Sequence, residues 1–119
     1  MMVLVDTSVW VDHLRRGNSE LAGLLNEGQV LCHPFVIGEL ACRNLEERDE
    51  ILRLLRALVP TPVAEHEEIL AFLQNQSLYG RGLGWIDVHL LASARLMPCP
   101  IWTLDKGLKS AAEHLKLVA

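Results

Sequence analysis

The segment Met2-Val3-Leu4-Val5-Asp6-Thr7-Ser8 joins a strand pattern directly to the start of a helix. Its first four residues are apolar and partly β-branched, which favours a short buried strand. Asp6, Thr7 and Ser8 then supply side chains that cap the N-terminus of a helix. A strand that runs into a helix is the unit from which parallel sheets are built, so this segment predicts an α/β protein.

The same alternation of strands and helices continues along the chain. We expect further strands at residues 30–32, around 58–59, at 101–104 and, as an edge strand, at 115–118. We expect helices from residue 7 to about 14, at 19–26 with Ser19 as its cap, at 34–40, 46–58, 65–78 and 85–96, and after Asp105. Together they predict an α/β sandwich around a mainly parallel sheet.

Length and composition predict one domain over residues 1–119, because half of the residues are apolar and can form one core. The net charge of −4 argues against a broad basic face for nucleic acid, although it permits RNA as a substrate. The sequence has neither a signal-peptide pattern nor the roughly 20 apolar residues that span a bilayer. We therefore expect a cytoplasmic protein without membrane contact, with its three cysteines as buried thiols: Cys32, Cys42 and Cys99.

Four of the fifteen acidic residues interrupt apolar runs, whereas most of the others lie in polar stretches. These four are Asp6, Glu39, Asp87 and Asp105. Asp6 and Asp105 follow expected strands, and the active crevice of a parallel sheet lies at the carboxyl ends of its strands. An unpaired inward carboxylate costs several kcal/mol, so one shared divalent cation would remove this cost for all four together.

Each of these acids also has a simpler explanation. Asp6 and Asp105 could be plain helix N-caps, and Glu39 could pair with Arg43 one turn along its own helix. Asp87 is the hardest to explain without a metal, because its neighbours on both sides are apolar. One shared site explains the four acids together better than four separate coincidences do.

A donor set made only of carboxylate oxygens favours Mg²⁺ or Mn²⁺ over zinc. Mg²⁺ keeps several waters, so such a site has room for phosphate oxygens and for an attacking water, as phosphodiester hydrolysis requires. The hydroxyls of Ser8 and Thr103 could orient the acids, whereas we interpret Thr7 as an ordinary capping residue. Asp12, beside His13, is a weaker candidate that we interpret as exposed.

Four segments resemble the PIN domain, and within it the VapC-type toxins of prokaryotic toxin–antitoxin pairs. They are D-T-S-V-W-V-D-H-L at 6–14, V-I-G-E-L at 36–40, G-L-G-W-I-D-V-H-L-L-A-S-A at 82–94 and T-L-D-K-G-L at 103–108. The resemblance implies a three-layer α/β/α fold with a short parallel sheet, and an Mg²⁺- or Mn²⁺-dependent endoribonuclease that acts on structured RNA such as transfer or ribosomal RNA. It also implies that the family's acids fall on Asp6, Glu39, Asp87 and Asp105, and its orienting hydroxyls on Ser8 and Thr103.

The resemblance further implies a homodimer and a cognate antitoxin that wraps the toxin and places a basic side chain near the acids. Basic residues near the expected rim of the site are candidates for contacts with RNA phosphates: Arg15, Arg16, Arg81 and Lys106.

Other classes of function fit the sequence less well. A receiver-type phosphotransfer domain needs an acid at a strand end in mid-chain, where this chain has the charged helix around residues 46–50. A haloacid-dehalogenase-like phosphatase needs D-x-D after its first strand, but here Asp6 is followed by Thr7 and Ser8. A non-enzymatic alternative stays open, namely a catalytically silent PIN-like module that grips a basic peptide or RNA.

Overall fold

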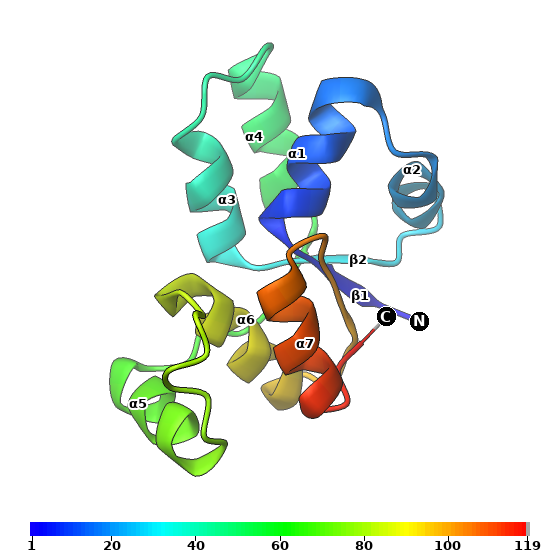
Figure 1. The fold of residues 1–119 in the computed structure, drawn as a ribbon. Helices are drawn as coiled ribbons and strands as arrows, with labels where there is room; N and C mark the ends of the chain where they lie inside the picture. The colour runs from blue at the N-terminus through cyan, green and yellow to red at the C-terminus, as the bar shows by residue number, and fades with distance from the viewer. Residues whose placement is uncertain (119) are drawn as a thin grey trace.

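The structure is a computed structural model that describes residues 1–118. Its elements are, in chain order, β1 (Val3–Val5), α1 (Thr7–Arg16), α2 (Ser19–Asn26), β2 (Val30–Cys32), α3 (Pro34–Ala41), α4 (Arg48–Arg56), β3 (Val59–Pro60), α5 (His66–Asn75), α6 (Trp85–Leu96), β4 (Ile101–Trp102) and α7 (Lys106–His114). The helices α1 to α4 lie on one side of the sheet and α5 to α7 on the other (Figure 1). The expected three-layer α/β/α sandwich is therefore confirmed.

The sheet has the strand order β3-β2-β1-β4, and each described strand pair is parallel, so the sheet is more uniform than the mainly parallel one expected. Leu4 in β1 pairs with Leu31 in β2 on one side and with Ile101 in β4 on the other. From β1 the chain adds β2 and β3 in one direction, whereas β4 lies on the opposite side of β1. The strand order reverses between β1 and β4, and a parallel sheet forms its binding crevice at the carboxyl ends of the strands at such a point.

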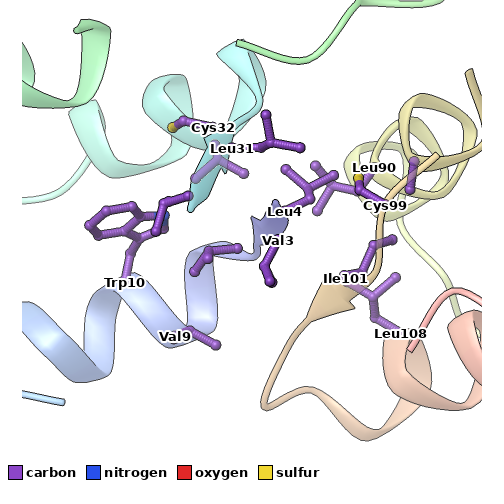
Figure 2. Packing of buried hydrophobic residues seen from close by; sticks show 14 of the residues in the cluster. Val3, Leu4, Val9, Trp10, Leu31, Cys32, Leu90, Cys99, Ile101 and Leu108 are labelled. Atoms are coloured by element: carbon purple, nitrogen blue, oxygen red, sulfur yellow. The ribbon is translucent and has the colours of Figure 1, made fainter. Parts of the chain in front are cut away.

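The core is centred on β1, which is buried along its whole length. Figure 2 shows Val9 and Trp10 from α1 on one side of this strand and Leu90 from α6 on the other. Short strands without exposed side chains are typical of a parallel sheet that helices cover on both faces. The centre of the core therefore lies directly before Asp6, the residue that follows β1.

Several element boundaries differ from those expected, because side chains and backbone geometry define the ends. Asn18, not Ser19, caps α2, since its side-chain oxygen accepts a hydrogen bond from the backbone N–H of Leu21 at 3.0 Å. Helix α4 spans 48–56 rather than 46–58, and it follows Glu47, whose φ of 51° is incompatible with a right-handed helix. Helix α5 spans 66–75 rather than 65–78.

The strands are also shorter than, or displaced from, those expected. Strand β3 covers 59–60 rather than 58–59, and Pro60, which has no N–H, is tolerated because β3 lies at the edge of the sheet. Strand β4 ends at Trp102 rather than at residue 104. The edge strand expected at 115–118 is reduced to a single parallel bridge between Ile101 and Val118.

Two expectations from composition concern burial and membrane contact. Cys32 and Cys99 are buried thiols, but Cys42 is exposed just after the end of α3, so the expectation of three buried cysteines was wrong. Within residues 1–118, no helix combines the length and the apolar character that crossing a membrane requires.

We predict that Leu4→Ala lowers the free energy of unfolding by about 2–5 kcal/mol, because Leu4 is fully buried at the centre of the sheet. Urea unfolding followed by circular dichroism measures this change. Leu96→Ala is the control, since Leu96 is 56% exposed, and we expect it to change stability by less than about 0.5 kcal/mol. Equal effects of the two substitutions would contradict the placement of β1 in the core.

Candidate active site

Four helices bring acidic side chains to the carboxyl ends of β1 and β4. Asp6 and Asp105 are the N-caps of α1 and α7, Asp87 lies in the first turn of α6, and Glu39 lies in α3. Burial raises the pKa of Asp87, and the negative charges of the other three acids raise it further, which places those three within electrostatic range of Asp87. In Figure 1, α1, α3, α6 and α7 surround the centre of the molecule.

Asp6 is the most firmly held of the four acids. Its side chain is buried, and a single oxygen, Oδ2, accepts three hydrogen bonds. The hydroxyls of Ser8 and Thr103 donate to it at 2.7 Å each, and the backbone N–H of Ser8 donates at 3.4 Å. These three donors hold the buried carboxylate in one orientation.

The same two hydroxyls connect Asp6 to the segment between β4 and α7. Ser8 Oγ accepts a hydrogen bond from the backbone N–H of Leu104 at 2.9 Å, and Thr103 Oγ1 accepts one from the backbone N–H of Asp105 at 3.0 Å. Each hydroxyl thus donates to Asp6 and accepts from the chain that leads to Asp105. These bonds also explain why β4 ends early, since residues 103–105 turn from the sheet toward α1.

Each of the other three acids also accepts a hydrogen bond on one oxygen. Asp87 Oδ2 accepts from the backbone N–H of Gly84 at 3.0 Å, and Asp105 Oδ2 accepts from the backbone N–H of Leu108 at 2.8 Å. Glu39 Oε1 accepts from the hydroxyl of Thr7 at 2.5 Å. Interpreting Thr7 as no more than a capping residue was therefore wrong, because its hydroxyl links α1 to an acid on α3.

The second oxygen of each acid has no hydrogen-bond partner within residues 1–118: Asp6 Oδ1, Glu39 Oε2, Asp87 Oδ1 and Asp105 Oδ1. Nor does any Lys, Arg or His of that range form an ion pair with these acids, so the pairing of Glu39 with Arg43 considered above is absent. Four carboxylates without a counter-charge form a donor set that suits a hard divalent cation.

The acids do not form a closed set of metal ligands. Over the described part of the chain, no three His, Cys, Asp or Glu side chains form a group that could hold an ion as they stand. Mg²⁺ keeps several water ligands and binds few carboxylates directly, so it does not need a closed set of protein ligands. The residues therefore fit a hydrated cation better than one that they enclose.

Burial differs among the four acids, although all were expected to point inward. Asp6 is 6% exposed, Glu39 and Asp87 are half-buried, and Asp105 is exposed, so the expectation was wrong for Asp105. Burial is the main cause that raises the pKa of Asp87, and the hydrogen bond from Gly84 opposes it. The simpler explanation of Asp6 and Asp105 as N-caps is correct as geometry, yet in each case capping occupies only one carboxylate oxygen.

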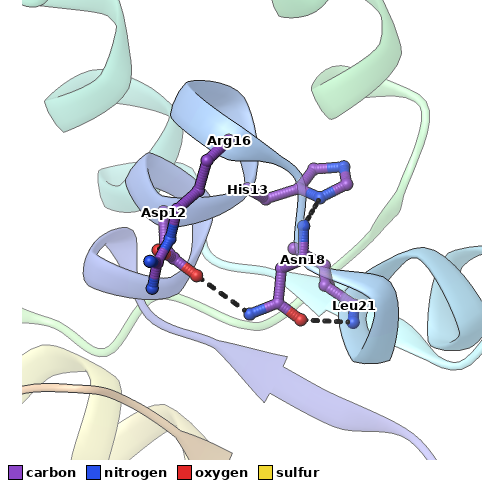
Figure 3. A network of polar contacts seen from close by, with 5 residues as sticks. All are labelled: Asp12, His13, Arg16, Asn18 and Leu21. Carbon is purple, nitrogen blue, oxygen red and sulfur yellow. Dashed lines mark hydrogen bonds and ion pairs between the residues drawn. The ribbon is translucent and has the colours of Figure 1, made fainter.

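The candidate RNA-contacting residues on α1 lie farther from the acids than expected. Arg15 and Arg16 are in the last turn of α1, about 13–15 Å along the helix axis from Asp6. Arg16 forms an ion pair with Asp12, whose side chain is only 17% exposed, so interpreting Asp12 as exposed was wrong. Figure 3 shows that Asp12 also accepts a hydrogen bond from Asn18, which makes it part of the junction between α1 and α2.

The other two basic candidates are exposed and closer to the acids in sequence. Lys106 directly follows Asp105, and Arg81 lies in the loop that precedes α6. Neither of them forms an ion pair with another residue of the 1–118 range. Both are therefore available to a charged ligand at this end of the sheet.

Two buried histidines, one at the start of α3 and one in α6, were not predicted from the sequence. His33 caps α3, because its Nδ1 accepts the backbone N–H of Phe35 at 2.9 Å, and its ring lies 6.1 Å from that of His89 in α6. Burial and the neighbouring His89 lower the pKa of His33 to about 4, so the ring is neutral near pH 7. The position of His33 directly before Pro34, at a helix start, was the signal that could have identified it.

Comparison with known proteins agrees with this architecture. Residues 3–114 match the family model described as the PIN domain. The chain is 46% identical over 111 residues to Ribonuclease VapC32 from two strains of Mycobacterium tuberculosis, CDC 1551 / Oshkosh and ATCC 25618 / H37Rv. Each alignment covers 92% of this chain and 90% of the relative. The chain therefore belongs to the PIN-domain family, and within it to the VapC group that these relatives represent.

We predict that Thr103→Val lowers the free energy of unfolding by about 1–3 kcal/mol. Valine keeps the shape of threonine, but it leaves Asp6 without one donor and the backbone N–H of Asp105 without its acceptor. Urea unfolding measures the loss. The control removes a hydroxyl from the exposed face of α7: Ser110→Ala should leave stability within about 0.5 kcal/mol of the parent.

We predict that His33 makes the protein less stable as the pH falls below about 6.5. Because the pKa of His33 is lower in the folded state than the ordinary value of 6.5, the unfolded state takes up the proton first. The contribution of neutral His33 to the free energy of unfolding is fully present above pH 6.5. Up to about 3 kcal/mol of this contribution is lost as the pH falls toward 4. His33→Asn keeps an acceptor for the helix cap, and its unfolding free energy should fall less between these pH values. Parallel pH curves for the two proteins would contradict the prediction.

Proposed function

We propose that this protein is a divalent-cation-dependent endoribonuclease that hydrolyses RNA phosphodiester bonds and serves as the toxin of a toxin–antitoxin pair. The observation that carries the proposal is the hydrogen bonding of its four acids and their lack of counter-charges. Each is held through one oxygen and leaves the other without a partner, and no cationic side chain of residues 1–118 balances them. The similarity to proteins named ribonuclease supports the choice of substrate.

We assign Asp6, Glu39, Asp87 and Asp105 as the acids that bind Mg²⁺ or Mn²⁺. The bound cation would supply charge stabilisation and make a water molecule easier to deprotonate. Asp6 is the most rigid of the four, because three hydrogen bonds fix its carboxylate and leave Oδ1 to face a ligand. Ser8 and Thr103 act through Asp6, since both of their hydroxyl protons are directed at it.

Glu39 and Asp87 are the acids best suited to orient the attacking water. Both are half-buried, and each keeps one oxygen without a protein donor in the described chain. A general base has to lie within hydrogen-bond reach of that water, and the first turn of α6 holds Asp87 in place through Gly84.

Basic side chains near the acids would contact RNA phosphates and offset the net charge of −4 locally. Lys106 and Arg81 are exposed on the segments that begin α7 and precede α6. A shallow hollow along α1 runs from Ser8 to Arg15 and Arg16, which extends a path for the RNA backbone away from the acids. We propose these four basic residues as phosphate contacts.

The partners follow from the same assignment. A VapC-type toxin requires a cognate antitoxin, and a cluster of acids without counter-charges would attract a basic side chain of that antitoxin. We propose a homodimer and a cytoplasmic location on the basis of the family. Structured RNA such as transfer or ribosomal RNA is the proposed substrate class. A catalytically silent module would retain the fold and bind RNA or a basic peptide without cutting RNA.

We predict that the purified protein cuts RNA in the presence of Mn²⁺ or Mg²⁺ and that EDTA stops the reaction. Asp87→Asn should lower the rate by about 100-fold or more, because it removes a charged ligand and base. The same substitution should raise the melting temperature without metal by a few degrees, since it removes a half-buried charge that three other acids repel. Gel assays of RNA cleavage and thermal unfolding monitor the two effects.

The matched control is Asp49→Asn, which changes an exposed acid at the start of α4 and should leave the cleavage rate at the parental value. If Asp87→Asn cuts RNA as fast as the parent, the assignment of the site is wrong. If the parent binds RNA or Mn²⁺ but cuts no RNA, the catalytically silent module is the correct description.

A further inference from the structure

Trp85 differs from the other two tryptophans in its surroundings. Trp10 is buried in the core and Trp102 is half-buried in β4, whereas Trp85 is 40% exposed. Burying an indole is among the largest apolar gains available to a small domain, so an indole left at the surface is an informative exception. Neither the core nor the four acids account for this side chain.

The position of Trp85 places it at the candidate active site. It is the first residue of α6, between Gly84 and the turn that contains Asp87. Asp87 folds back to accept the N–H of Gly84, so its carboxylate and the indole share one end of the helix. The two residues lie about 3 Å apart along the helix axis, and their side chains leave the helix on different faces. The indole is therefore positioned for the nucleotide next to one that contacts Asp87.

Two imidazoles hold the indole in place. The ring of His66, at the start of α5, lies 5.1 Å from that of Trp85 at an angle of 42°, and the ring of His89 lies 5.3 Å away at 76°. His89 is buried and also contacts Phe35 of α3 at 4.6 Å. An aromatic surface that neighbouring rings fix in advance loses little freedom when a flat ligand stacks on it.

An RNA base is the flat ligand that fits this position. Bases stack on exposed aromatic side chains irrespective of sequence, but only where they are not already stacked inside a duplex. Arg81, exposed in the loop four residues before Trp85, adds a positive charge suited to the RNA backbone. An apolar protein surface would instead have to cover the adjacent uncompensated acids, which costs free energy.

We propose that Trp85, supported by His66, forms a subsite that stacks an unpaired base next to the phosphodiester bond cut at the four acids. The proposal rests on the proposed ribonuclease function and adds to it a residue that selects RNA with an unstacked base at the cleavage position. In this subsite Trp85 binds RNA, whereas the four acids carry out the hydrolysis.

The experiment compares cleavage by the parent, Trp85→Phe and Trp85→Leu in Mn²⁺. The probe is a labelled hairpin RNA that contains the cut site in its loop, together with versions in which each loop nucleotide in turn is abasic. We expect Trp85→Leu, which keeps apolar bulk but has no aromatic face, to lower kcat/KM by about 5- to 150-fold. Trp85→Phe should retain most of the parental kcat/KM. Thermal unfolding confirms that each variant is folded.

The abasic series separates stacking from a structural role. One abasic position should lower kcat/KM of the parent by a similar factor, and the same position should have little further effect on Trp85→Leu. The control is Leu96→Ala, at the opposite end of α6, which should cut every probe as the parent does. A merely structural role would lower all rates without this dependence on position.

Two results would overturn the proposal, and they differ in what they say about the proposed function. If the parent cuts the hairpin and Trp85→Leu cuts it equally well, the stacking subsite is wrong while the ribonuclease stands. If Trp85→Leu cuts RNA as the parent does but loses binding to a protein partner, the indole is a protein contact. The stacking subsite is then wrong as well. If the parent cuts no RNA, the proposed function fails, and the subsite that rests on it fails as well.

Discussion

The candidate active site depends on one carboxylate oxygen, Asp6 Oδ2, which accepts hydroxyl donors from both sides of the point where the strand order reverses. Ser8 comes from α1 and Thr103 from the segment after β4, and the two hydroxyls also accept backbone N–H groups of residues 104 and 105. This arrangement joins the start of α1 to the start of α7. It fixes Asp6 directly and sets the position of Asp105, so both acids are tied to the centre of the sheet.

The rest of the site concentrates negative charge that stability alone would disfavour. Burial and three neighbouring acids raise the pKa of Asp87, which shows that the fold holds this carboxylate in an unfavourable environment. The fully buried residues of β1 and the helices packed on it provide the compensating stability. Such a site is typical of a protein that trades some stability for a function, since a cation or a basic partner would relieve the repulsion on binding.

Much of the fold was predictable because its signals are local. Periodicity and capping residues predicted the alternation of strands and helices and the full extent of α6, and interrupted apolar runs drew attention to the four acids. The contacts that organise the site were not predictable in the same way: Thr7 reaches Glu39 across 32 positions, and Thr103 reaches Asp6 across 97. Which hydroxyl meets which carboxylate depends on how helices pack, and the pattern of a single segment does not contain that information. The same limit applies to Arg15 and Arg16, whose distance from the acids depends on the length of α1.

The two margins of the sheet constrain how copies of this protein can associate. On one side β3 ends in Pro60, which has no N–H to offer to an added strand. On the other side the bridge from Ile101 to Val118 already occupies part of β4. Neither margin is suited to continuous hydrogen bonding with a strand from another molecule, so accidental polymerisation through backbone pairing is disfavoured. A specific dimer would therefore be built from side chains on the helices, where sequence changes can tune which chains recognise each other.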